Sequence, residues 1–203
     1  MIETEKRLIA MKKIGDELLL FKKSPLYKFR KDNKYFPVVG EGSHAAKIMF
    51  VGEAPGQNEA ISGRPFCGRS GALLDELLKS VNIKREDVYI TNIVKDRPPE
   101  NRDPTPEEKA LYAPFLDRQI DIIKPKVVAT LGRHSMEYIM ARFDLGKNIE
   151  PIGQIHGKVF EAKLSYGQVY VVALYHPAVA IYNVRQKPTL IKDFKVIRKL
   201  VFN

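Results

Sequence analysis

An apolar run that leads into two glycine-rich turns and then a helix constrains the fold of this chain most. Residues 48–51 are continuously apolar, and Gly-Glu-Ala-Pro-Gly follows at 52–56. A second glycine-rich turn at 63–71 opens a helix that we expect over 72–81. Glycines let a backbone approach a ligand closely and present its N–H groups. The pattern predicts a buried strand followed by a ligand-binding loop.

The rest of the chain alternates strands and helices in the same way. We expect helices at 3–23, 106–124, 132–140 and 192–201, and strands at 47–51, 88–93 and 127–131. Residues 158–163 and 169–174 read as a hairpin around 165–167, and Thr105 with Glu108 forms a capping box for the third helix. Such alternation is typical of an α/β fold, a mostly parallel sheet covered on both faces.

Composition limits the class of protein. The 203 residues predict a single domain over 1–203, with the N-terminal helix of residues 1–24 packing on the core. We find neither an apolar run of membrane-spanning length nor a signal peptide, so we expect a cytoplasmic protein with no membrane partner. The net charge of +10 favours a polyanionic partner, although it also fits the solubility charge of heat-adapted proteins.

The single cysteine, Cys67, excludes an internal disulfide and a metal site held by several cysteines. It lies in the glycine-rich loop, and we expect it to be a small packing residue rather than a nucleophile.

Ligands of open parallel sheets bind beyond the carboxyl ends of the strands. The loops at those ends carry Glu53, Phe66, Asn92 and His176. An asparagine amide can accept from N3–H and donate to O4 of uracil, whereas cytosine presents the reverse pattern. Each side chain alone more often has a structural role, as a turn cap or core residue. Their occurrence together after three strand ends indicates one binding site.

These segments resemble the uracil-DNA glycosylase superfamily, specifically its family 4. The matching text is Val51-Gly-Glu-Ala-Pro-Gly56, Gly63-Arg-Pro-Phe-Cys-Gly-Arg-Ser-Gly71, Thr91-Asn-Ile-Val-Lys95, Arg97-Pro-Pro-Glu-Asn-Arg-Asp-Pro-Thr-Pro-Glu-Glu108, Leu131-Gly132 and His176-Pro-Ala178. The resemblance extends from about residue 18 to residue 200, and the combination of motifs is far more specific than any one of them.

The resemblance implies a three-layer α/β/α sandwich around a short, mainly parallel central sheet. It implies a DNA repair enzyme that hydrolyses the N-glycosidic bond of deoxyuridine, releasing free uracil and leaving an abasic site. The target base is flipped out of the duplex into the pocket. The expected partner is uracil-containing DNA, and the protein is expected to work as a monomer without a cofactor.

In the family, the position of Phe66 stacks on uracil, that of Asn92 reads its polar edge, and that of His176 stabilises the oxygen at C2. A donor aimed at this developing oxyanion stabilises the transition state more than the ground state.

The first glycine-rich turn is implied to hold uracil and the water through Gly52, Ala54 and Gly56. We assign Glu53 to orienting water and offsetting charge on the sugar. We assign Glu59 to crowding C5 and so rejecting the methyl group of thymine. Ala54 stands where better-known relatives have an aspartate.

The segment after His176 resembles a loop that enters the DNA minor groove, although 180–182 reads Ala-Ile-Tyr where the family usually has Leu-Leu-Arg. We expect Ile181 or Tyr182 to be the wedge. The basic side chains expected on phosphates are Arg64, Arg69, Arg185 and Lys187.

Family 4 enzymes typically hold a four-iron, four-sulfur cluster on four cysteines. The matching positions here are Phe21, Ser24, Asp96 and Tyr112, none of which is a thiol. We therefore expect a cluster-free member, in which packing of Phe21 near Tyr112 or hydrogen bonding ties the N-terminal helix to the core.

Three alternatives remain from the sequence. One is a glycosylase with a broader range of deaminated bases, such as hypoxanthine and xanthine. Another is a protein that binds lesions in DNA without cleaving, and a third is covalent capture of DNA. Nothing between residues 92 and 105 resembles the inserted basic loop of the group that captures DNA.

Overall fold

The structure is a computed structural model that describes residues 3–202, so residues 1, 2 and 203 of the predicted domain lie outside the described residues. One six-stranded sheet forms its centre, in the order β1-β3-β2-β4-β6-β5. Strands β3, β2, β4 and β6 are parallel, and β1 and β5 pair antiparallel at the two edges. The strands are β1 (Glu41–Gly42), β2 (Ile48–Gly52), β3 (Tyr89–Asn92), β4 (Val127–Leu131), β5 (Val159–Leu164) and β6 (Gly167–Leu174).

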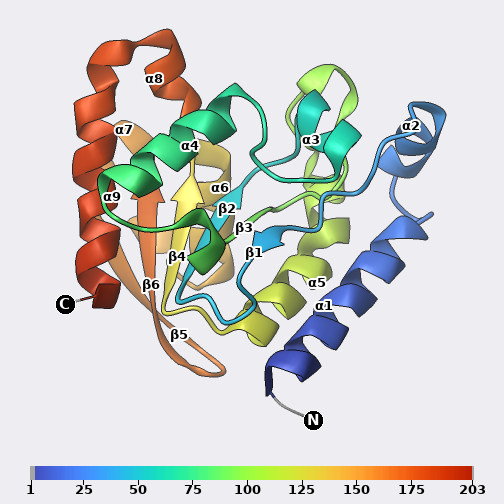
Figure 1. Ribbon diagram of the computed structural model, residues 1–203, viewed down its shortest axis with the longest axis horizontal. Coiled ribbons are helices and arrows are strands. Elements are labelled where there is room, and N and C mark those ends of the chain that lie inside the picture. The colour runs from blue at the N-terminus through green and yellow to red at the C-terminus, as the bar shows by residue number, and fades with distance from the viewer. Residues whose placement is uncertain (1–2, 203) are drawn as a thin grey trace.

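Helices cover both faces of the sheet (Figure 1). The longer ones are α1 (Glu3–Leu19), α4 (Arg69–Ser80), α5 (Pro106–Ile123), α6 (Arg133–Arg142) and α9 (Lys187–Phe202). The shorter ones are α2 (Leu26–Asp32), α3 (Gln57–Ser62), α7 (Ile152–Ile155) and α8 (Ala178–Tyr182). Helices α1, α5 and α6 bury their apolar sides in one core cluster, and α4 and α9 in a second one.

The alternation of side chains along β2 explains the three layers. Met49 and Val51 belong to the cluster beneath α1, α5 and α6, whereas Ile48 and Phe50 belong to the cluster beneath α4 and α9. Successive side chains of a strand point to opposite faces, so an unbroken apolar run requires cover on both sides. The predicted α/β/α sandwich with a short, mainly parallel sheet is confirmed.

The predicted longer helices and strands appear with ends shifted by a few residues, and the capping box of Thr105 and Glu108 is present. Helix α9 begins at Lys187 rather than 192, because Pro188 is tolerated within the first helical turn. The sequence did not predict β1, α2, α3, α7 or α8, which are too short to show a hydrophobic period. No helix among residues 3–202 is long and apolar enough to cross a membrane.

The four positions at which the resemblance implies a cluster do lie together, as a hydrogen-bonded network. The Tyr112 hydroxyl donates to Asp96 at 2.5 Å and lies 2.9 Å from the Ser24 hydroxyl. The Phe21 and Tyr112 rings pack edge to face with centroids 5.5 Å apart, as expected. Buried Arg30 donates to both Asp96 oxygens, at 2.9 and 3.2 Å.

These groups do not fit an iron–sulfur cluster, because the network offers no thiolate and a guanidinium pairs with its only carboxylate. Arg30 also donates to the carbonyls of Leu18 and Leu19. The network therefore ties the end of α1 to α2, to α5 and to the loop after β3.

Candidate active site

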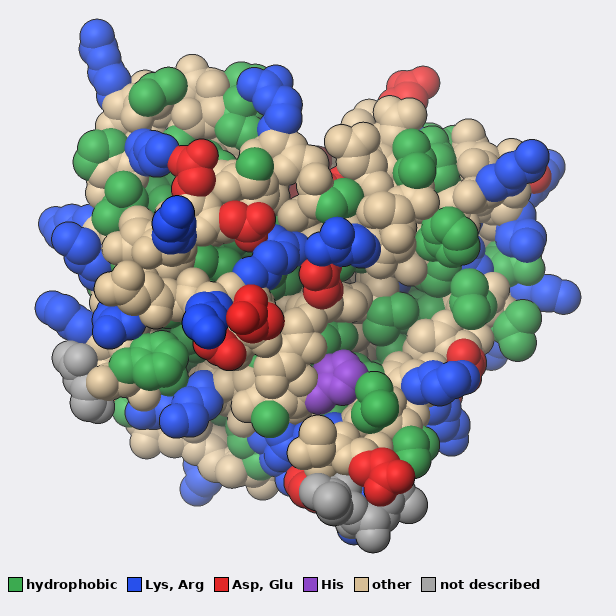
Figure 2. Space-filling view, in the orientation of Figure 1, with side chains coloured by type: hydrophobic (Ala, Val, Ile, Leu, Met, Phe, Trp, Pro, Cys, Tyr) green, Lys and Arg blue, Asp and Glu red, His purple; other side chains and the backbone are tan. Residues whose placement is uncertain are grey.

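Two adjoining cavities open at the carboxyl edge of the sheet, where the space-filling outline is indented between α4 and α3 (Figure 2). We call the larger the base chamber, with a volume of about 530 Å³ and a lining that includes Glu59, Phe66 and Arg69. The smaller, the acid chamber, has about 250 Å³ and includes Glu53, Asp103 and His134. Asn92 and His176 line both.

Gly52 lets two of the predicted side chains meet. It ends β2 directly opposite Asn92 of β3. A Cβ added there would lie 2.3 Å from the Asn92 Oδ1 and 2.9 Å from the Phe66 ring. Only glycine allows both groups to approach so closely. Phe66 itself has a φ of 48°, which an aromatic residue rarely adopts, so the loop holds its ring against a local conformational cost.

Asn92 is only 2% exposed, and its Oδ1 has no hydrogen-bond partner among the described residues. Most buried polar side-chain atoms in folded proteins are paired. An unpaired acceptor on a cavity wall is available to a ligand donor.

His176 lies against Phe66, with ring centroids 5.8 Å apart. Its Nδ1 accepts the backbone N–H of Ala178 at 3.1 Å, so the hydrogen of the neutral ring is on Nε2. Burial lowers the pKa of His176, against an opposing effect of Glu59, and so favours the neutral ring. The sequence left the charge of this donor open, and the structure favours a neutral Nε2–H donor.

Glu59 lies in α3 on the wall of the base chamber. Its Oε1 accepts the backbone N–H groups of Cys67 and Gly68, each at 3.0 Å, and so ties α3 to the start of α4. Cys67 is exposed, 3.2 Å from the Ser62 hydroxyl, so the interpretation of it as a small packing residue was wrong. The same Glu59 Oε1 also accepts from the Cys67 thiol at 3.7 Å, so Glu59 binds both the backbone and the side chain of this loop.

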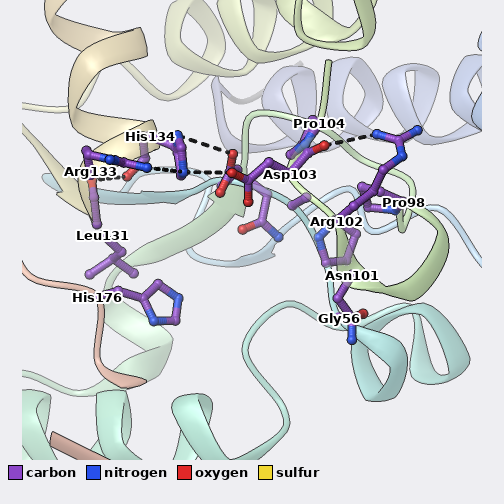
Figure 3. A pocket seen from close by; sticks show the side chains of 16 residues that line it. Gly56, Pro98, Asn101, Arg102, Asp103, Pro104, Leu131, Arg133, His134 and His176 are labelled. Atoms are coloured by element: carbon purple, nitrogen blue, oxygen red, sulfur yellow. Dashed lines mark hydrogen bonds and ion pairs between the residues drawn. The ribbon is translucent and has the colours of Figure 1, made fainter. Parts of the chain in front are cut away.

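Glu53 lines the acid chamber together with Asp103 and His134, the two side chains of this cluster that Figure 3 labels. Its Oε1 is 3.4 Å from Lys109 Nζ and 3.8 Å from His134 Nδ1. Burial raises the pKa of Glu53, which His134 and Lys109 lower and Asp103 raises. Glu53, Asp103 and His134 bring potential metal donor atoms within 4.8 Å of one another. Lys109 already lies beside the Glu53 carboxylate. We therefore interpret Glu53, Asp103 and His134 as a cluster of paired charged groups and not as a metal site.

The predicted DNA contacts differ in exposure. Tyr182 is 88% exposed, whereas Ile181 packs partly against the second core cluster. Arg185 is exposed, and Arg69 lines the base chamber. Two of the predicted phosphate ligands are engaged within the chain, Arg64 with Glu41 and Lys187 with Glu76. On the face shown in Figure 2, basic side chains are scattered among acidic ones.

Among the residues that sequence reasoning missed, Asp103 and His134 line the acid chamber. Val184, 72% exposed, follows the exposed Tyr182 by two positions and was not singled out either. His134 follows the Leu131-Gly132 motif by two residues, a signal that could have found it. Its approach to Glu53 depends on how α6 docks, which no local pattern shows.

Comparison with known proteins assigns the family. Residues 39–198 match the family described as Uracil DNA glycosylase superfamily. The chain is 46% identical to a "Type-4 uracil-DNA glycosylase" of Sulfurisphaera tokodaii, over 94% of this chain and 84% of the relative. It is 43% identical to a protein of the same name from Archaeoglobus fulgidus, over 91% and 89%. A "Type-5 uracil-DNA glycosylase" of Thermus thermophilus is 32% identical over 69% and 68%. The chain therefore belongs to the uracil-DNA glycosylase superfamily.

Proposed function

We propose that this protein is a DNA repair glycosylase that hydrolyses the N-glycosidic bond of deoxyuridine in DNA. The products are free uracil and an abasic site. The names and similarity of the type-4 relatives support this reaction, as does the base chamber with its aromatic, amide and imidazole groups.

The observation that carries the proposal is the buried, unpaired Oδ1 of Asn92. The N3–H of an extruded uracil would satisfy it, while the amide Nδ2 donates to O4. A site built to pair with a substrate donor rejects analogues that lack it, because its buried polar group is then left unsatisfied. Cytosine has a lone pair at N3 and is rejected on this ground.

Cleavage breaks the C1′–N1 bond and leaves its electron pair on uracil, spread over N1, O2 and O4. The Nε2–H of His176 would donate to O2, where this charge develops. A neutral imidazole suits the role, because Nδ1 is already occupied by the Ala178 N–H and only one donor points away. Phe66, beside His176, stacks on the departing ring.

Water must add to C1′, and the proton that it loses as the C1′–O bond forms goes to the uracil anion, giving neutral uracil. Glu53 follows Gly52 at the end of β2, so its carboxylate is placed to orient this water in the acid chamber. Its negative charge also offsets the positive charge that develops on the sugar. Glu59 closes the base chamber on the side of Gly56, where it would exclude a C5 methyl group.

We further propose that Tyr182, with Val184, enters the duplex while Arg69 and Arg185 contact phosphates. Arg64 and Lys187 would have to exchange their present carboxylate partners for phosphate. The described part of one chain lines both chambers, which supports action as a monomer. Burial of Met11, Ile14 and Leu18 with the sheet supports one domain.

Excision from matched oligonucleotides that carry uracil, hypoxanthine, xanthine, thymine or cytosine tests the proposal, with alkaline cleavage reporting abasic sites. We expect cleavage at uracil and a loss of at least about a hundredfold in Asn92→Ala. Equal cleavage at hypoxanthine or xanthine would favour the broader base range, and binding without cleavage would favour a lesion-binding protein.

A further inference from the structure

The acid chamber contains a histidine that the reaction above leaves unused. His134 lies in the first turn of α6, and its side chain is 26% exposed. Its Nδ1 faces Glu53 Oε1 at 3.8 Å, while its Nε2 lies 3.1 Å from Asp103 Oδ2 and 3.2 Å from Arg133 Nη2 (Figure 3). The ring is thus held between two carboxylates and a guanidinium.

The neighbours of His134 determine which nitrogen carries a hydrogen. In the neutral ring, Nε2 can accept from Arg133 only if the hydrogen is on Nδ1. In the charged ring, Nε2–H donates to Asp103 and Nδ1 also carries a hydrogen. Each neutral form leaves a lone pair facing one carboxylate, because a bare Nε2 faces Asp103 at 3.1 Å and a bare Nδ1 faces Glu53 at 3.8 Å. Only the charged ring presents an N–H to both carboxylates, and one of these N–H groups is aimed at Glu53.

Glu53 has a matching need. Its Oε1 is buried, and Lys109 Nζ at 3.4 Å lies close enough to pair with it as an ion but is not aligned for a regular hydrogen bond. The Nδ1–Oε1 distance must shorten by about 1 Å to form one, and catalytic hydrogen bonds are often long before substrate binds. Burial raises the pKa of this carboxyl group, so a nearby donor or positive charge is needed to keep it ionised.

We propose that His134 is a positioning residue, which donates its Nδ1–H to Glu53 and so orients that carboxylate and keeps it ionised to hold the water. Asp103 and Arg133 hold the ring in the orientation that does this. The inference rests on the proposed function, because it assigns a partner to the carboxylate that the hydrolysis uses.

Other charged or titratable groups contact Glu53 or line the same chamber, and the test must separate them from His134. They are Lys109 of α5, Asp103 and Arg102 of the preceding loop, Arg133 of α6 and His176 after β6. Lys109 lies 3.4 Å from Glu53 Oε1, so part of the stabilisation of the carboxylate remains when His134 is replaced. Variants of His134 therefore change the ionisation of Glu53 without abolishing it.

The pH profile of the single-turnover excision rate tests the proposal with His134→Ala, His134→Asn and, as control, His44→Gln outside both chambers. For His134→Ala we expect a plateau about tenfold lower and an acid limb about one pH unit higher, with KM unchanged. His134→Asn restores a neutral donor and should recover most of the plateau rate. An unmoved acid limb, or His134→Asn no better than His134→Ala, would overturn the proposal.

A double-mutant cycle with Glu53→Gln then asks whether His134 acts through Glu53. In the Glu53→Gln background, adding His134→Ala should change the rate less than about twofold, because the two residues act as one unit. A full tenfold further loss would show that His134 acts independently. If the unsubstituted protein releases no uracil, the proposed function is wrong. If it releases uracil, the outcomes for the variants test only the role of His134.

Discussion

Replacing Asp96 by asparagine removes the negative charge from the network that ties α1 and α2 to the core. Asp96 is fully buried and Arg30 is 2% exposed, so Asp96→Asn leaves a guanidinium in the interior without its counter-charge. Breaking a buried pair on one side costs about 3–5 kcal/mol. The carbonyls of Leu18 and Leu19 still accept from Arg30, so we expect the free energy of unfolding to fall by about 3 kcal/mol, at the low end of that range.

Equilibrium unfolding in guanidinium chloride measures this loss, and for a chain of this length it corresponds to a fall in Tm of about 6–12 °C. Asp75→Asn is the matched control, because its partner Arg85 and its own carboxylate are partly exposed and such a pair contributes less than about 1 kcal/mol. Replacing both buried partners, Arg30→Met with Asp96→Leu, should cost less than Asp96→Asn alone. The reasoning is refuted if Asp96→Asn loses no more stability than the Asp75 control.

Three further predictions concern the base chamber. His176→Ala should slow single-turnover excision by about 10²–10³-fold while the affinity for uracil-containing DNA changes little, and equal losses in both would contradict its role. Asn92→Asp should gain activity on cytosine relative to uracil, measured on paired oligonucleotides; an unchanged preference would show that this side chain does not read the base. Gly52→Ala should reduce excision at least about tenfold with Tm within a few degrees, because its Cβ displaces Asn92 and Phe66; full activity would mean that the close approach is unnecessary.

Local patterns were enough to predict five of the six strands, and they singled out Asn92 and His176, which line both chambers. The apolar run of β2 and the strand before Asn92 identify buried parallel strands, and the strand-end rule then brings Asn92 and His176 to one edge. The glycine at position 52 indicates that other groups approach the backbone closely there. These features depend on neighbours in sequence or on a general rule of topology.

Contacts that depend on docking could not be predicted in the same way. Arg30 and Asp96 are 66 positions apart, and their pairing exists only once α2 packs beside the loop after β3. The left-handed backbone of Phe66 and the exposure of Cys67 belong to a loop that Glu59 binds from α3, a contact that sequence spacing does not reveal. The resemblance located the four network positions but not the hydrogen bonds among them.

The lone acceptor of Asn92 has a consequence for evolution and for engineering. A buried acceptor without a protein partner costs stability, so the oxygen that we propose reads uracil is also expected to weaken the protein without its ligand. We expect an apolar residue at position 92 to raise the melting temperature and to remove the discrimination between uracil and cytosine. Free uracil, by supplying the missing hydrogen, should reverse that penalty and raise the melting temperature as it accumulates.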